Sequence, residues 1–111
     1  MKAVTKADIK RINEVEEEDF LLINALPRED FNKKHIRTSI NIPFPDNDQF
    51  VDDVAKVAGE NKNRKIIVYC ANKECDVSPT AAKTLENADF SNVYDYEGGM
   101  EDWENKKEQA A

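Results

Sequence analysis

Continuous apolar runs separated by polar or amphipathic segments are the main pattern of this sequence. Two runs, 20–26 and 65–69, have the length and apolarity of strands buried on both faces of a mainly parallel sheet. Pro27 ends the first of them. Shorter strands are predicted over 39–43 and 90–96. The sequence therefore predicts four strands, spread over most of the chain.

A short amphipathic helix is predicted near the N-terminus. Its apolar face consists of residues at three-residue steps, Ile9, Ile12 and Val15. Thr5 is placed to cap the start of this helix, with Asp8 three residues on. Acidic residues crowd 14–19, where the helix dipole disfavours negative charge, so we expect the helix to end within that run.

Two longer helices are predicted on either side of the strand 65–69. We expect Asp48 to cap the first of them and Gly59 to end it. Its apolar side consists of Phe50, Val51, Val54, Val57 and Ala58. The second covers about 78–87, with Pro79 in its first turn, where the missing N–H is not needed. The residues that it turns inward are Ala81, Ala82 and Leu85.

The order of these elements predicts the fold class. Strands and helices alternate, a polar segment at 28–35 is expected to form one helical turn, and Met100 and Trp103 form a short closing helix that packs against the sheet. Right-handed crossovers between parallel strands then give a three-layer α/β domain with helices flanking a mainly parallel central sheet. We expect a single domain over 1–111, with a core of about 5–106 and a frayed C-terminal tail at 107–111.

Composition and charge narrow the class of function. The chain carries 16 basic and 23 acidic residues, and this net charge of −7 argues against nucleic acid or an anionic membrane as a partner. No apolar run reaches the length of a membrane span and the first residues lack a secretory signal, so we expect a cytoplasmic protein, with a mature secreted form as the alternative. Two cysteines and one histidine do not form a zinc site of familiar spacing, so the cysteines are interpreted as thiols.

The chemistry is expected where the strand 65–69 ends. Cys70 follows this strand, and a polar loop separates it from the next helix, which is where α/β folds place their sites. If the amides of 71–77 curl around Cys70, their N–H dipoles and the helix N-terminus favour the thiolate and make it a nucleophile. The alternative is a small buried residue at a strand end, because free cysteine is among the most buried residue types.

An ordered set of segments resembles one known family over nearly the whole chain. The segments are Leu22-Ile23-Asn24-Ala25, Phe31 through His35-Ile36, Ser39-Ile40-Asn41-Ile42-Pro43, Ile67-Val68-Tyr69-Cys70, and Val93 through Glu97-Gly98-Gly99-Met100-Glu101-Asp102-Trp103. In this order they resemble the corresponding segments of single-domain rhodaneses, which belong to the rhodanese-like sulfurtransferase family. One segment alone would be a weak signal, and their order makes the resemblance specific.

The resemblance implies a sulfurtransferase in which Cys70 accepts a sulfane sulfur from a donor, carries it as a persulfide and passes it to a nucleophilic acceptor. The loop backbone that it nominates as the cradle for the sulfur is that of Ala71, Asn72, Lys73, Glu74, Cys75 and Asp76, and the predicted ring of amides extends to Val77. It implies no metal or organic cofactor. The implied partners are a small sulfur donor or a protein persulfide, and a protein acceptor. Two displacements at one thiolate predict ping-pong kinetics.

Two departures from the family pattern concern the scaffold and the loop. Asn24-Ala25-Leu26 stands where an Asp-Val-Arg sequence is common, so an ion pair of the common pattern is absent. The loop before Ala81-Ala82 is longer than usual and contains Cys75. This second cysteine is either a resolving thiol, which would form an intraloop disulfide with Cys70, or a loop-packing residue.

A third departure concerns charge. The basic residue that is common near the end of the loop is missing, and Glu74 and Asp76 lie close to Cys70 in the sequence, with Lys73 offsetting only part of their charge. We therefore expect a persulfide donor rather than thiosulfate. Phosphatase chemistry is disfavoured, because the loop 71–77 contains no arginine to clamp the phosphate oxygens.

Three functional hypotheses follow from these features. The leading one is a persulfide sulfurtransferase. The second is a catalytically silent rhodanese-like module that binds a protein partner, and the third is a thiol redox or sensor protein that uses Cys70 and Cys75. His35 is expected to be structural, because its segment belongs to the scaffold.

Overall fold

The computed structural model describes residues 2–14, 20–44, 47–59 and 61–104, and they form an α/β domain. The strands are β1 (Lys2–Ala3), β2 (Phe20–Asn24), β3 (Ile40–Asn41), β4 (Lys65–Tyr69) and β5 (Val93–Tyr96). The helices are α1 (Lys6–Glu14), α2 (Arg28–Lys33), α3 (Asn47–Ala58), α4 (Val77–Asn87) and α5 (Gly99–Glu104). The predicted three-layer fold class is confirmed.

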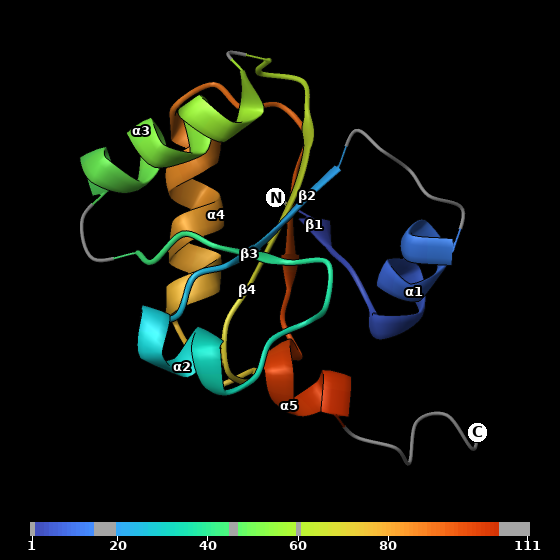
Figure 1. The fold of residues 1–111 in the computed structure, drawn as a ribbon. Helices are drawn as coiled ribbons and strands as arrows, with labels where there is room; N and C mark the ends of the chain where they lie inside the picture. Colours follow the sequence, from blue (N-terminus) through green and yellow to red (C-terminus); the bar gives the residue numbers. More distant parts are fainter. Residues whose placement is uncertain (1, 15–19, 45–46, 60, 105–111) are drawn as a thin grey trace.

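All strand pairs in the sheet are parallel, and the strand order is β1-β5-β4-β2-β3. The strand β4 lies at the centre, between β5 and β2, and its burial on both faces matches its uninterrupted apolar sequence. In Figure 1 the helices α3 and α4 cover one face of the sheet, while α1 and α5 lie on the other. The carboxyl ends of the central strands therefore meet at one edge of a three-layer domain.

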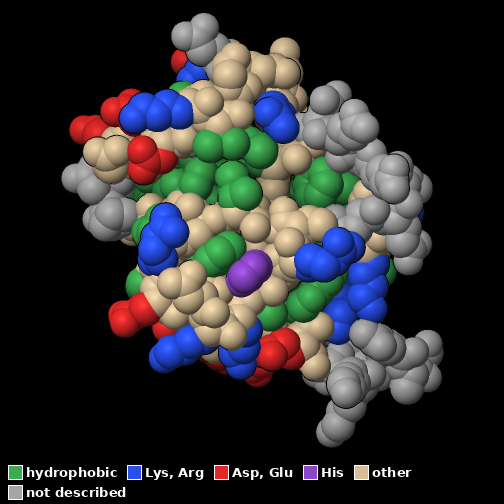
Figure 2. All heavy atoms as spheres, viewed as in Figure 1, with side chains coloured by type: hydrophobic (Ala, Val, Ile, Leu, Met, Phe, Trp, Pro, Cys, Tyr) green, Lys and Arg blue, Asp and Glu red, His purple; other side chains and the backbone are tan. Residues whose placement is uncertain are grey.

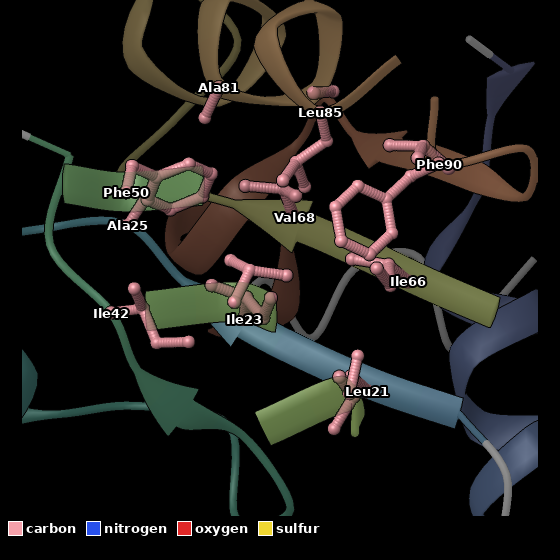
Figure 3. Packing of buried hydrophobic residues seen from close by; sticks show 14 residues of the cluster. Leu21, Ile23, Ala25, Ile42, Phe50, Ile66, Val68, Ala81, Leu85 and Phe90 are labelled. Carbon is pink, nitrogen blue, oxygen red and sulfur yellow. The ribbon is translucent and has the colours of Figure 1, made fainter. Parts of the chain in front are cut away.

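Each face of the sheet has its own hydrophobic cluster. On the α3 and α4 side, buried side chains of both helices pack against alternate residues of the strands, as Figure 3 shows; the labelled members are Leu21, Ile23, Ala25, Ile42, Phe50, Ile66, Val68, Ala81, Leu85 and Phe90. The opposite cluster consists of Ile9, Ile12, Leu22, Ile36, Ile67, Tyr69, Tyr96 and Met100. Alternate strand residues thus enter opposite clusters, as the pleat of a strand requires.

The predicted helix starts and ends are confirmed in part. At the start of α1 the Asp8 N–H donates to Thr5 Oγ1 (3.2 Å) and the Thr5 N–H donates to Asp8 Oδ2 (3.0 Å), which is the predicted reciprocal cap. Gly59, with φ +66°, ends α3 in a left-handed conformation that glycine adopts without steric cost. The predicted end of the first helix within 15–19 and the predicted frayed tail at 107–111 lie outside the described residues.

Several sequence predictions differ from the structure: the strands predicted over 20–26, 39–43 and 90–96 are shorter, as β2, β3 and β5. Asp48 lies inside α3, which begins at Asn47, so it is not the cap; its charge in the first turn instead suits the helix dipole. Val57 is 42% exposed, because the buried face of α3 follows steps of four residues through Phe50, Val54 and Ala58. The edge strand β1 was not predicted: at two residues it is too short to show a period.

The buried hydroxyl of Tyr69 connects β4 through hydrogen bonds to β2 and to the segment before β3. Ser39 Oγ donates to the Ile36 carbonyl oxygen (2.6 Å), so the Tyr69 hydroxyl donates its single proton to Ser39 Oγ (2.8 Å). The Tyr69 oxygen also accepts from Asn24 Nδ2 and from the Ile36 N–H, both at 3.0 Å. Its donor and both lone pairs are therefore used. The sequence at 24–26 lacks the ion pair that is common in the family that this chain resembles. Asn24 instead makes a neutral hydrogen bond to the Tyr69 hydroxyl.

Replacing Tyr69 with Phe should destabilise the fold by about 3 kcal/mol, because two buried donors, Asn24 Nδ2 and the Ile36 N–H, lose their acceptor. Urea unfolding measures the difference. Tyr94→Phe is the matched control: its hydroxyl makes no hydrogen bond with the described residues, so the change should stay within about 0.5 kcal/mol. Equal stabilities for the two variants would contradict the role assigned to Tyr69.

Candidate functional site

Cys70 lies directly after β4, at the carboxyl end of the central strand. Its side chain is buried, with 1% of the residue exposed, and α4 begins at Val77 after a six-residue loop. The neighbouring strand ends of β2 and β5 are level with it, because Tyr69 is in register with Asn24 and with Tyr96. The predicted position of the cysteine between a strand and a helix is confirmed.

The base of the loop is held by the turn that follows β5. The N–H groups of Met100 and Glu101 donate to the carbonyl oxygens of Cys70 (2.9 Å) and Ala71 (2.8 Å). Gly99 has φ +64°, and a Cβ on it would lie 2.5 Å from the Cys70 carbonyl oxygen. The close approach of the two backbones therefore requires glycine at this position.

Cys70 forms a disulfide with Cys75, and the two Cα atoms are 6.6 Å apart. Both cysteines of the chain are used in this bond. Cys75 is partly exposed, whereas Cys70 is buried. The structure thus describes the oxidised form of the loop, in which Cys70 is not available as a nucleophile.

Two of the loop amides point within the loop in this form. Asn72 accepts both of them: the Glu74 N–H donates to its Oδ1 (3.0 Å) and the Cys75 N–H to its carbonyl oxygen (3.1 Å). These two N–H groups therefore do not line the Cys70 sulfur here. The amide cradle over 71–77 stays a prediction for the reduced loop.

A buried polar pair lies on the other side of the Cys70 sulfur. Ser78 Oγ, in the first turn of α4, is 3.5 Å from Cys70 Sγ and donates to Asp95 Oδ1 at 2.7 Å. Ser78 and Asp95 are each 1% exposed. Burial raises the pKa of the Asp95 carboxyl, the Ser78 hydrogen bond opposes the rise, and the charge of Glu97 adds to it.

Sequence reasoning missed Ser78 and Asp95. A signal for Asp95 was present: it shares one face of β5 with Val93, where an apolar side chain would be expected facing α4. By contrast, the loop side chains of Lys73, Glu74 and Asp76 are exposed, so solvent screens their charge. The carboxylate with the closest connection to the sulfur is therefore Asp95, and not Glu74 or Asp76 as the sequence suggested.

A pocket of about 550 Å³ opens beside the loop, between α2 and α5. It is lined by Leu26, Asp30, Lys33, Lys34, Ala71, Asn72, Met100, Glu101 and Glu104. Its Lys34 Nζ is paired with Glu104 Oε1 at 2.9 Å. Apolar side chains thus meet charges of both signs next to the residues that follow Cys70.

His35 lies on the surface, where it is the purple side chain in Figure 2. Its ring stacks on Phe31, with the centroids 3.9 Å apart, and its Nδ1 lies 2.8 Å from the Phe31 carbonyl oxygen. No group of three or more His, Cys, Asp and Glu residues that could hold a metal ion occurs in the described ranges. None of the helices in the described part of the chain combines the length and apolarity needed to cross a membrane.

Solved structures of other proteins share the fold of this chain. The BH2092 protein from Bacillus halodurans is 26% identical, with a TM-score of 0.80 over 97% of this chain and 73% of that chain. The human single-domain sulfurtransferase TSTD1 shares the fold at 12% identity, with a TM-score of 0.77 over 96% of this chain and 97% of its own.

A curated relative shares sequence over most of the chain. The HTH-type transcriptional regulator Rv0324 of Mycobacterium tuberculosis is 30% identical over 101 residues, which are 91% of this chain and 41% of the regulator. This chain therefore spans about two-fifths of that relative's length. A family model described as Rhodanese-like domain matches residues 7–106, and the chain belongs to the rhodanese-like domain family.

Proposed function

We propose that the protein is a sulfurtransferase that moves a sulfane sulfur through a persulfide on Cys70. The observation that carries the proposal is the position of Cys70 at the carboxyl end of the central strand, with its carbonyl fixed by α5. Family membership and the fold shared with a protein named as a sulfurtransferase support it. A dithiol reductant must first reduce the disulfide between Cys70 and Cys75; it is itself oxidised to a disulfide and releases both thiols.

The proposed reaction consists of two displacements at sulfur. The Cys70 thiolate attacks the outer sulfur of a donor persulfide; a new S–S bond forms on Cys70, and the donor leaves as a thiolate with the electron pair of the broken bond. An acceptor thiolate then attacks the outer sulfur of the Cys70 persulfide. The outer sulfur passes to the acceptor, and Cys70 leaves as a thiolate. No net oxidation occurs, and each step trades one thiolate for another.

A low-molecular-weight persulfide or a persulfide on a protein is the proposed donor. Of the loop side chains between Cys70 and α4, one is cationic and two are carboxylates, so the entrance offers no excess positive charge to a dianion such as thiosulfate. The adjoining pocket, with apolar lining and charges of both signs, suits the body of a thiol compound or a protein side chain. A reducing compartment such as the cytoplasm fits this chemistry, because it keeps thiols reduced.

The disulfide favours a second function, that of a thiol redox or sensor protein that cycles between the Cys70–Cys75 disulfide and the dithiol. A third reading, a catalytically silent module that binds a partner, draws support from the relative that is named as a transcriptional regulator, in which a rhodanese-like segment is a part of a longer protein. Reactivity of Cys70 separates the first two readings from the third.

Reduced wild type should gain one sulfur atom from glutathione persulfide and pass it to an acceptor thiol, and Cys70→Ser should gain none. Intact mass spectrometry measures the adduct. Thiosulfate at the same concentration should load the wild type at least about tenfold more slowly, because the loop offers a dianion only one cationic side chain, Lys73, and no arginine. A wild type that stays unmodified with every donor would rule out the transferase, and oxidation to the Cys70–Cys75 disulfide would then separate the redox protein from the silent module.

Mild oxidation of the wild type should remove two hydrogens and block sulfur loading until a dithiol reductant is added, because Cys70 is then held in the disulfide. Cys75→Ser is the matched control, which keeps Cys70 but offers no resolving thiol. Its loading should survive the same brief oxidation or be lost only to sulfenate formation, visible as one added oxygen. Equal loading of oxidised and reduced wild type would contradict this role of Cys75.

A further inference from the structure

The two proposed displacements assign no role to Ser78 and Asp95, which are connected to Cys70 in a buried row of polar groups. It begins at the sulfur, crosses the first turn of α4 and ends on β5, over contacts of 3.5 Å and 2.7 Å. All three residues are 1% exposed, so bulk water does not compete for the hydrogen bonds between them. A carboxyl group that is buried and connected to a thiol by one hydroxyl affects the charge which that thiol can carry.

The hydroxyl of Ser78 has one proton to donate. When Asp95 is ionised, Ser78 donates to it, and the oxygen of Ser78 turns its lone pairs toward sulfur. Once the disulfide is reduced, the Ser78 oxygen that lies 3.5 Å from Cys70 Sγ suits a Cys70 thiol, which donates its S–H, and opposes a thiolate, which needs a donor. When Asp95 is neutral, its own O–H can donate to Ser78, and the Ser78 proton is then free for a sulfur anion.

We propose that Ser78 and Asp95 are positioning residues for Cys70, in which the Ser78 hydroxyl donates to the sulfur anion and the charge on Asp95 decides whether it can do so. An ionised Asp95 holds Cys70 as the thiol. A neutral Asp95 supports the thiolate and the persulfide anion. This inference rests on the proposed function for the identity of the nucleophile, and it adds the group that sets the nucleophile's protonation.

The surroundings of Asp95 contain few other charges. Its neighbours in the sheet are Ala3 of β1 and Val68 of β4, and α4 presents Ser78 to it. Among the described residues, the charge that acts on it is that of the exposed Glu97, which together with burial raises the pKa of Asp95. A raised pKa makes the neutral form of Asp95 easier to reach than that of an exposed aspartate.

Titration of Cys70 in a Cys75→Ser background tests the proposal, with thiolate formation followed by its ultraviolet absorbance and Cys70→Ser/Cys75→Ser as the blank. Asp95→Asn should lower the pKa of Cys70 by about one unit, which is about tenfold more thiolate at a pH below that pKa. The amide can donate to Ser78 and carries no charge. Ser78→Ala should raise the Cys70 pKa, because the donor to the sulfur anion is lost.

A third variant tests the route through the hydroxyl. In Ser78→Ala/Asp95→Asn most of the effect of Asp95→Asn should disappear, because the side chain at 95 acts through Ser78. Asp76→Asn is the matched control: it removes an exposed carboxylate nearer in sequence to Cys70 and should leave the pKa within about 0.3 units. Circular dichroism checks that each variant is folded.

An unchanged or raised Cys70 pKa in Asp95→Asn overturns the proposal, and so does an equal effect of Asp95→Asn with and without Ser78. The near-isosteric Asp95→Asn decides the sign by itself if Ser78→Ala does not fold. The titration uses no sulfur donor, so its outcome is independent of sulfur transfer. A shifted pKa in a protein that accepts no sulfur would overturn the proposed function and leave the role of Asp95 standing.

Discussion

The contact between the turn after β5 and the backbone of Cys70 is the constraint on which the site depends. Two N–H groups at the start of α5 donate to the first two carbonyls of the loop, and only glycine at position 99 allows the backbones to come so close. The same turn ends the strand that carries Asp95. One local conformation therefore sets both the position of the sulfur and that of the carboxyl group behind it.

The sheet adds rigidity beneath this contact. Tyr69, the residue before Cys70, is fully buried and has every hydrogen-bonding position of its hydroxyl filled by β2 and by the segment before β3. A saturated buried network of this kind has one favourable arrangement, since any shift leaves a donor or an acceptor unpaired. The strand end that carries Cys70 is thus held by the side-chain hydrogen bonds of Tyr69 and by the backbone hydrogen bonds from α5.

How far the sequence alone could go follows from the range of the interactions concerned. The central strands, the fold class and the position of Cys70 between a strand and a helix could be predicted, because uninterrupted apolar runs and a strand–loop–helix order are local patterns. The pairing of Ser78 with Asp95 could not, because it joins α4 to β5 across 17 residues of chain and forms only once the sheet is assembled. The predicted effect of Glu74 and Asp76 on the Cys70 thiol did not take into account that both side chains are exposed to solvent. Their distance from Cys70 along the chain does not show this exposure.

The two edges of the sheet differ from its centre in length. The strands β1 and β3, which lie at the edges, have two residues each, whereas β2 and β4 have five. A long exposed edge offers a row of unpaired backbone groups on which a second chain can add as a further strand. Edges of two residues offer few such groups, so among the described strands the sheet gives little support to strand-to-strand aggregation.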